Sequence, residues 1–367
     1  MRVVIAGGGT AGHISPSIAV AHRLRAGGAS VEFVGSPIGQ EASLVPAAGF
    51  RFHGLRATPF RREISIRSAT APFVALGSVM AARPVVRGAS AVLGMGGYAS
   101  LAPVLAARSL RVPTVVHEQN AVPGLANRLL ARIATVMALT FESSRARLPG
   151  SVRAELTGLP LRPEIAAVRS DRETLTEEAR RSLDLRPGRT TVLVTGGSQG
   201  ALHLDRIVAA TIPLLAGRAD LQLLVLAGAT KETVVTDAAR LEMDLLVRVL
   251  PYLDRMELAL AVADVAVARA GANTVHELAA CAVPSILVPY PHATDDHQLE
   301  NARELEIAGA AEIFLDRELT PRGLADRISA LVDDADRRAA MSSAATGWAT
   351  PDADERVAAL VRSVARP

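Results

Sequence analysis

The sequence predicts an α/β protein made of two doubly wound, Rossmann-like units in tandem. Apolar strand-like runs alternate with segments of helical spacing, which is typical of a parallel sheet covered by helices on both faces. The pattern restarts near residue 190, and each half opens with a glycine-rich turn between an apolar run and a helix-like segment. A length of 367 residues suits two domains.

In the first half, the elements follow from the spacing of apolar residues. We predict buried strands at residues 2–6, 31–35, 91–95, 114–118 and 135–140. Helical spacing occupies 16–26 and 123–133. The uncharged stretch 88–107 is long enough to be considered as a membrane helix. Its four glycines and Pro103 favour a strand, a glycine loop and a helix instead.

The second half repeats this organisation without close sequence repetition. Residues 190–215 again read strand, glycine loop and helix. Further strands are expected at 221–228, 247–253, 263–271 and 285–291, and a helix from about 352 onward. We place the junction between the halves within 160–189, where a proline-containing segment leads into a charged helical stretch.

Composition excludes several classes of protein. The single Cys281 excludes a disulfide framework and a cysteine-based zinc site, and it fits a reducing compartment. The first strand begins so near Met1 that we expect no signal peptide. Aromatic residues make up only 3%, which argues against a base-stacking nucleic-acid surface. Residues 1–165 hold 18 arginines, no lysine and seven acidic residues, so this half should meet something anionic.

The turn GGGTAGH (7–13) satisfies the G-x-G-x-x-G fingerprint of dinucleotide-binding proteins. That function also needs an acidic residue at the end of the second strand, but Glu32 lies at its start and the strand ends in Gly35 and Ser36. We therefore disfavour NAD. The glycines and the following helix N-terminus still favour a bound ligand. His13, in the first helical turn, is either a general base or a packing and capping residue.

Two more polar segments follow predicted strands. GGSQGA (196–201) lacks the ending of a Walker loop, and Ser198 and Gln199 add side-chain donors that suit a pyrophosphate; a plain tight turn is the alternative. HEQN (117–120) ends a strand, where ligands of α/β sheets bind. A metal site at HEQN is disfavoured because the His–Glu pair lacks ligand spacing.

Two later segments carry carboxylates near a helix start. In RAGANTVHE (269–277), a helix that begins near Asn273 or Thr274 places Glu277 where it could accept from two ribose hydroxyls. Thr274 and Glu277 also fit a capping box. PHATDDHQLENA (291–302) contains Asp295, Asp296, His297 and Gln298, which suit either a metal site or a solvated helix start that donates to a sugar.

Taken together, GGGTAGH, GMGGY, HEQN, GGSQGA, RAGANTVHE and DHQLENA, in that order over residues 7–302, resemble the MurG family of bacterial peptidoglycan glycosyltransferases. The resemblance implies the GT-B fold, with two Rossmann-like domains facing across a cleft. These would be an acceptor- and membrane-facing domain at 1–162, to which a helix at about 350–367 returns, and a UDP-GlcNAc-binding domain at 163–349.

The resemblance also implies the reaction. An inverting transferase would move GlcNAc from UDP-GlcNAc to the muramyl 4-hydroxyl of undecaprenyl-linked lipid I and so form lipid II. It would work without a cofactor or an obligatory catalytic metal, as a peripheral protein at the cytoplasmic face of the membrane. Its partners would be UDP-GlcNAc, lipid I and an anionic membrane surface, not a nucleic acid.

Site residues follow from the matched motifs. His13 is the first candidate for the catalytic base and Glu118 the second. The expected acceptor-binding residues are Gly96, Gly97 and Tyr98. The expected UDP-GlcNAc-binding residues are Thr10, Ala11, Gly12, Asn120, Arg162, Ser198, Gln199, Leu253, Ala272, Asn273, Thr274, Val275, His276, Glu277 and Gln298. Three positions depart from the family pattern: Ala11 replaces a glycine, Asn273 replaces a smaller or apolar residue, and LPLR (159–162) replaces N-P-x-R.

The segment 54–87 mixes basic and apolar residues, and we expect it to meet an anionic leaflet. The residues concerned are Arg56, Arg61, Arg62, Arg67, Arg83 and Arg87, with Ile64, Ile66, Phe73, Val74, Leu76, Val79 and Met80. A core helix with a solvated basic edge is the alternative.

Two rival functions share the architecture. A UDP-GlcNAc 2-epimerase needs no lipid acceptor and hence no basic apolar surface. A non-catalytic nucleotide-sugar-binding protein would keep GGSQGA and Glu277 but would not need His13 and HEQN.

Overall fold

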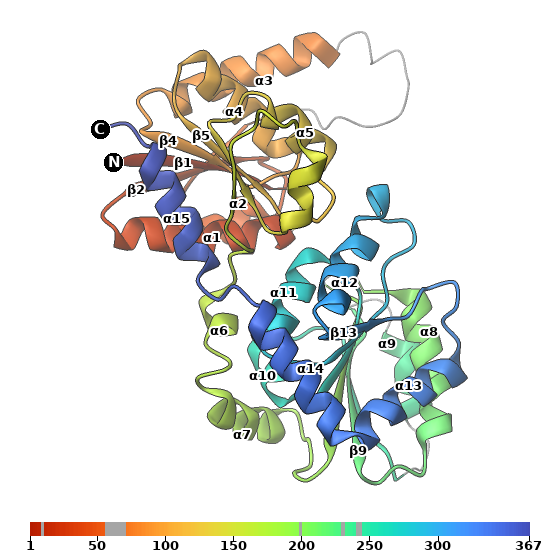
Figure 1. Cartoon of the computed structure of the whole chain (residues 1–367). Helices are drawn as coiled ribbons and strands as arrows, with labels where there is room; N and C mark the ends of the chain where they lie inside the picture. Colours follow the sequence, from red (N-terminus) through yellow and green to blue (C-terminus); the bar gives the residue numbers. More distant parts are fainter. Residues whose placement is uncertain (9–10, 56–70, 198–199, 229–231, 240–243) are drawn as a thin grey trace. The chain divides into compact units, whose positions relative to one another are not determined.

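The computed structural model describes residues 1–8, 11–55, 71–197, 200–228, 232–239 and 244–367. The chain divides into two compact units, and Figure 1 labels most of their helices and some of their strands. Unit 1 comprises Met1–Arg162 and Thr350–Pro367, and unit 2 comprises Pro163–Ala349.

Unit 1 is built on a parallel sheet of seven strands in the order β3-β2-β1-β4-β5-β6-β7. The strands are β1 (Arg2–Ala6), β2 (Ser30–Gly35), β3 (Arg51–Gly54), β4 (Ala91–Gly94), β5 (Thr114–Glu118), β6 (Val136–Leu139) and β7 (Ala154–Leu156). The central strands β4, β5 and β6 are buried along their whole length. Their sequences are continuous apolar runs because both faces of a parallel sheet are covered.

Helices cover both faces of this sheet. They are α1 (Ala11–Ala26), α2 (Glu41–Ala47), α3 (Ala71–Val86), α4 (Leu101–Ser109), α5 (Leu125–Ala131) and α15 (Ala353–Val364). Apolar residues of α1, α2 and α15 form the core on one face, and those of α3, α4 and α5 form it on the other. Figure 1 shows α1 beside α15 on one side of the sheet and α3 and α4 on the opposite side.

The C-terminal helix α15 is a structural part of unit 1. Val357 and Val361 are fully buried against that unit's core. Arg23 of α1 donates to the Asp354 carboxylate at 2.6 Å, and the backbone N–H of Arg366 donates to the Ser90 carbonyl at 2.9 Å. Helix α15 therefore completes the hydrophobic core that β1 and α1 form in unit 1.

Unit 2 has a second parallel sheet, of six strands, in the order β10-β9-β8-β11-β12-β13. The strands are β8 (Thr190–Thr195), β9 (Leu221–Leu226), β10 (Leu246–Leu250), β11 (Val265–Ala268), β12 (Ser285–Leu287) and β13 (Ala311–Ile313). Its helices are α6 (Pro163–Ala166), α7 (Arg172–Ser182), α8 (Leu202–Thr211), α9 (Glu232–Ala239), α10 (Met256–Val262), α11 (Ala272–Ala280), α12 (His297–Ile307), α13 (Pro321–Asp333) and α14 (Ala335–Trp348).

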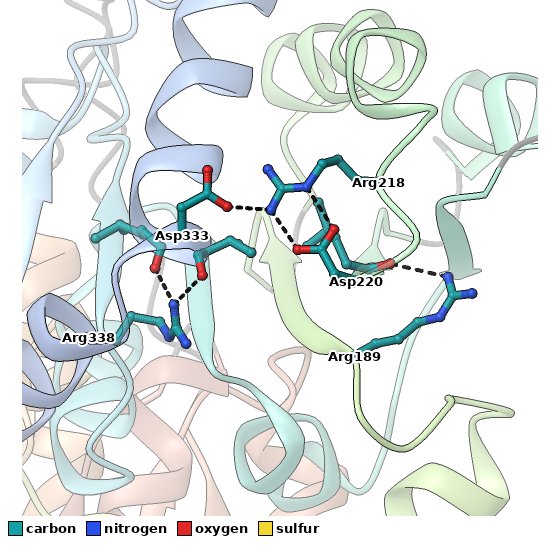
Figure 2. A network of polar contacts seen from close by, with 8 residues as sticks. Arg189, Arg218, Asp220, Asp333 and Arg338 are labelled. Carbon is teal, nitrogen blue, oxygen red and sulfur yellow. Dashed lines mark hydrogen bonds and ion pairs between the residues drawn. The ribbon is translucent and has the colours of Figure 1, made fainter.

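A polar network joins separate elements of unit 2 (Figure 2). The Arg218 guanidinium donates to the Asp220 carboxylate just before β9, at 2.7 and 2.8 Å, and to Asp333 at the end of α13, at 2.6 Å. Arg338 donates to the carbonyls of Leu331 and Val332, both at 2.5 Å. Both aspartates are largely exposed. The ion pairs therefore hold the end of α13, but each adds only about 1 kcal/mol or less to the free energy of unfolding.

The predicted α/β class and the two doubly wound sheets are confirmed, and 88–107 is a strand, a loop and a helix as expected. Three strands were missed: β3, β7 and β13. Each lies at an edge of its sheet, and apart from Ala311 its residues are half-buried or exposed. Its sequence therefore lacks the continuous apolar run by which the buried strands were predicted. Among the described residues, no helix combines the length and the apolar character needed to cross a membrane.

Candidate active site

Unit 1 gathers three of the predicted motifs where its strand order reverses. β1 and β4 are neighbours in the sheet, and the chain leaves them in opposite directions, toward β2 and toward β5. Ligands of open α/β sheets bind at such a switch point, outside the carboxyl ends of the strands. GGGTAGH follows β1, GMGGY follows β4, and HEQN closes β5.

His13 lies in the first turn of α1, as predicted, and is half-buried. The glycine loop after β4 comes close to its ring: a Cβ built on Gly96 would lie 3.5 Å from His13 Cδ2, and one built on Gly97 would lie 3.9 Å from Nε2. Both glycines have left-handed backbones, with φ of 87° and 71°. These two positions favour glycine for their conformation, and the missing side chains leave room beside the imidazole.

Burial lowers the pKa of His13 below its ordinary value of 6.5, and the negative charge of Glu41 opposes that shift. The imidazole is therefore neutral near pH 7 and has a nitrogen lone pair that can accept a proton. Tyr98 follows the two glycines and is exposed, so this edge of unit 1 is open to a ligand.

The Glu118 carboxylate organises the HEQN loop. It is 2% exposed and accepts hydrogen bonds from the backbone N–H of Asn120 at 2.9 Å, that of Gly124 at 3.1 Å and the Asn127 side chain at 2.8 Å. Burial raises its pKa, and these three donors act against that change. Asn127, which the sequence analysis did not single out, also donates to the His117 carbonyl at 3.0 Å.

His117 is fully buried, and its Nε2–H donates to the Gly158 carbonyl at 3.0 Å. Burial lowers its pKa to about 4, so this ring stays neutral and structural. Asn120 is half-buried, and its carbonyl accepts from the Ser144 hydroxyl at 2.9 Å. Arg162, at the end of the first segment of unit 1, is also half-buried.

Unit 2 repeats the arrangement at its own switch point, between β8 and β11. In the turn after β8, Gly197 and Gly200 have left-handed backbones, and a Cβ on Gly196 would lie 2.5 Å from the Ala201 nitrogen. The Gly200 N–H donates to the Gly197 carbonyl at 2.9 Å. The turn therefore requires glycine. Three predicted ligand-binding residues lie outside the described residues, namely Thr10, Ser198 and Gln199, and Ala11 is described only through its backbone.

The motif after β11 forms helix α11, which begins at Ala272 with Gly271 as the N-cap and without a side-chain cap. The predicted Thr274–Glu277 capping box is wrong, because Thr274 is the third helical residue and so lies too far inside to cap. Half-exposed side chains share one face of the first turns: Asn273, Thr274 and Glu277. This face suits a polar ligand.

The other predicted residues of this helix, Ala272, Val275 and His276, are buried. The His276 Nδ1–H donates to the Ala272 carbonyl at 2.9 Å, and its ring packs 4.8 Å from that of Trp348. The side chains of Val275 and His276 therefore support the helix, and only their backbones are available to a ligand.

Gln298 is the second residue of α12, and one atom of its amide is already hydrogen-bonded. Its Oε1 accepts from the Tyr290 N–H at 3.0 Å, which leaves its NH₂ group as the donor. Leu253 is half-buried after β10. Asp295 and Asp296 are exposed and have left-handed backbones, with φ of 53° and 51°. Within the described parts of the chain, no three His, Cys, Asp or Glu side chains are grouped so as to hold a metal ion.

Arg269, the first residue of RAGANTVHE, links three segments of unit 2, which its sequence did not indicate. It is 6% exposed and donates from Nη1 to the Asp316 carboxylate at 2.5 Å and to the carbonyls of Val288 and Pro289 at 3.1 and 3.2 Å. His203, in the first turn of α8, contacts the second oxygen of Asp316 at 3.0 Å. Through Asp316, Arg269 and His203 connect the ends of β11 and β12 to helix α8, which follows GGSQGA.

Known proteins resemble this chain in sequence and in structure over almost its whole length. Residues 3–139 match the glycosyltransferase family 28 N-terminal domain, and residues 191–357 match the family 28 C-terminal domain. A relative from Halothermothrix orenii is 37% identical over all of both chains and is named UDP-N-acetylglucosamine–N-acetylmuramyl-(pentapeptide) pyrophosphoryl-undecaprenol N-acetylglucosamine transferase. The crystal structure of MurG from Acinetobacter baumannii is 30% identical over 99% of each chain, with a TM-score of 0.80.

These matches and the two Rossmann-like sheets define a family 28 glycosyltransferase with the GT-B fold. The chain belongs to the MurG family. The UDP-GlcNAc 2-epimerase from Neisseria meningitidis has a TM-score of 0.71 at 11% identity, and this likeness shows a shared fold alone.

Proposed function

We propose that the chain transfers GlcNAc from UDP-GlcNAc to the 4-hydroxyl of undecaprenyl-pyrophosphoryl-MurNAc-pentapeptide, converting lipid I to lipid II in peptidoglycan synthesis. The full-length likeness to a relative with that name carries the proposal. It is supported by the two switch points, of which one holds a neutral histidine and the other a glycine turn beside a helix N-terminus. A neutral histidine can act as the general base, and a helix N-terminus can stabilise the leaving diphosphate.

Unit 2 would bind the donor. The Glu277 carboxylate, on the half-exposed face of α11, suits the two ribose hydroxyls. The first turn of α11 offers N–H groups to the diphosphate, and we assign Ser198 and Gln199, which lie outside the described residues, as additional donors. The Gln298 NH₂ group would donate to the sugar, and Leu253 would lie near the uracil. The resemblance to the MurG family also assigns Asn120 and Arg162 to donor binding.

Unit 1 would bind the acceptor at Gly96, Gly97 and Tyr98 and activate its hydroxyl. His13 takes the proton as the sugar carbon is attacked, because its imidazole is neutral and partly accessible. Glu118, although kept as a candidate base, is nearly inaccessible and already accepts three hydrogen bonds, so we assign it to positioning. Attack from the face opposite the leaving UDP inverts the anomeric carbon.

The departing diphosphate gains negative charge as the bond breaks. Aimed donors stabilise this charge, and each is worth about 2.7–4 kcal/mol where such donors have been removed from other enzymes. The first turn of α11, Ser198 and Arg162 are the groups we assign to this role.

A lipid acceptor also requires a membrane surface, which we assign to the segment 54–87 at the cytoplasmic face of the membrane. Residues 56–70 lie outside the described residues, but α3 is described from Ala71. Leu76 and Met80 are 61% and 56% exposed on this helix, whereas Ala82 and Val86 are buried against the sheet. Exposed apolar side chains near Arg83 and Arg87 suit an anionic leaflet.

Incubating the chain with labelled UDP-GlcNAc and a short-chain lipid I analogue tests the proposed reaction. We expect release of UDP together with a lipid-linked disaccharide whose new bond has the inverted, β configuration. Formation of UDP-ManNAc would support an epimerase instead, and binding of UDP-GlcNAc without any product would support a non-catalytic protein.

Replacing His13 with alanine should reduce kcat by about 10²–10⁴-fold, the usual contribution of a positioned base. UDP affinity should not change, because His13 is not among the proposed nucleotide-binding residues. His22→Ala is the matched control on the same helix and should keep normal turnover. In the wild type, the acid limb of the pH profile should lie below 6.5, since burial lowers the pKa of His13. A variant at His13 with near-normal kcat contradicts its assignment.

Glu277→Ala should weaken UDP-GlcNAc binding by about 10–100-fold, the worth of a charged hydrogen bond of about 1.5–3 kcal/mol. The donor analogue with a 2′-deoxyribose provides the control, because it lacks one of the proposed partners. It should bind the wild type more weakly but lose less affinity than UDP-GlcNAc on going to the variant. Equal losses for the two ligands would place Glu277 away from the 2′-hydroxyl.

Flotation with lipid vesicles tests the membrane surface. We expect the chain to bind vesicles that contain anionic lipid, and the double variant Leu76→Ser/Met80→Ser to bind about tenfold or more weakly, since each buried CH₂ is worth about 0.8 kcal/mol. Ile307→Ser is the control, because Ile307 is 83% exposed but lies in unit 2. Binding that depends neither on anionic lipid nor on α3 contradicts the assignment.

A further inference from the structure

A buried carboxylate lies against Gly8, after β1, and has no role in the proposed transfer of GlcNAc. Glu41 is the first residue of α2 and is 1% exposed. Its Oε1 accepts a hydrogen bond from the Ser36 N–H at 2.9 Å. Charged side chains are seldom fully buried in proteins unless a specific interaction requires them.

Three glycines from separate segments enclose this carboxylate. A Cβ built on Gly8, after β1, or on Gly39, before α2, would overlap the Glu41 carboxylate oxygens. A Cβ on Gly35, at the end of β2, would lie 2.9 Å from Glu41 Cγ. None of the three has a left-handed φ, so a side chain at these positions would not strain the backbone but would displace Glu41.

The enclosure connects Glu41 to the proposed acceptor side of the reaction. Gly8 lies in the turn that leads to His13, and its carbonyl would be 3.4 Å from a Cβ on Gly97. The negative charge of Glu41 also acts on the His13 imidazole, where it opposes the effect of burial. A carboxylate at this place therefore supports the chain at Gly8 and favours the cationic form that His13 reaches after it accepts a proton.

We propose that Glu41 is a positioning residue for glycosyl transfer, which holds the chain at Gly8 against Gly97 and balances the charge that develops on His13. The inference rests on the proposed function, because it assigns Glu41 to the step in which His13 is the base. Neither the family motifs nor the donor-binding residues include Glu41.

Glu41→Gln separates charge from shape. The amide has the same size, and its oxygen can still accept from Ser36, but the negative charge is lost. We expect kcat to fall about tenfold or more, while KM for UDP-GlcNAc stays within about twofold and the unfolding midpoint stays equal or rises. Glu41→Ala also removes the support of the turn, and its kcat should fall about 10²-fold.

Gly39→Ala offers an independent approach, since it displaces the carboxylate without removing it. We expect a loss of kcat similar to that of Glu41→Ala, and we expect the double variant to be no worse than the single ones, because both act on one contact. Glu32→Gln is the matched control: Glu32 belongs to the same unit, is 15% exposed, and accepts from His53 at 2.8 Å, away from the turn. It should keep normal kcat.

Two results would overturn the inference. One is a kcat within about twofold of the wild type in both Glu41→Gln and Glu41→Ala. The other is a loss of kcat that follows a loss of stability and occurs equally in Glu32→Gln, which would make Glu41 merely structural. If Glu41→Gln does not fold, Gly39→Ala decides by the same criteria. A wild-type chain that transfers no GlcNAc refutes the proposed function itself, whereas an active wild type with unaffected variants refutes only the role of Glu41.

Discussion

The reversal of strand order at the centre of each parallel sheet is the constraint on which the molecule depends. Parallel strands need a crossover after every strand, so all loops that follow strands emerge at one edge. Where the order reverses, at β1/β4 and at β8/β11, adjacent loops turn away from each other and leave room for a ligand. Every motif that suggested chemistry in the sequence follows a strand at or beside one of these two places.

Burial decides which titratable groups near the first switch point can change charge. His117 is enclosed and bonded to Gly158, so its ring is neutral and fixed, whereas His13 is neutral but partly accessible. Glu118 and Glu41 are both nearly inaccessible, and backbone N–H groups bond to each of them. The half-buried His13 imidazole is suited to receive a proton, because the negative charge of Glu41 favours its cationic form and the buried carboxylate is already fixed in place.

The sequence predicted the interior of the fold better than its borders. Strands with continuous apolar runs were found, and β1 and β5 match their predicted bounds, because burial on both faces leaves little choice of residue. The missed strands β3, β7 and β13 are edge strands, whose composition does not differ from that of loops. The start of α11 was misplaced for a related reason: Gly271 caps without a side chain and leaves no signal, whereas Thr274 resembles a cap that is not used.

The glycine turns and the order of the motifs can be read from the amino-acid sequence alone, and they identify the family. A turn that needs glycine and a strand that needs apolar residues are local requirements, which a linear pattern can display. Three contacts are visible only in the folded chain: the hydrogen bond between Asn127 and Glu118, the bonds by which Arg269 joins three segments, and the packing of Glu41 against Gly8. These contacts join residues that the crossovers bring together from separate segments, and their distances depend on how the helices pack, which no local pattern records.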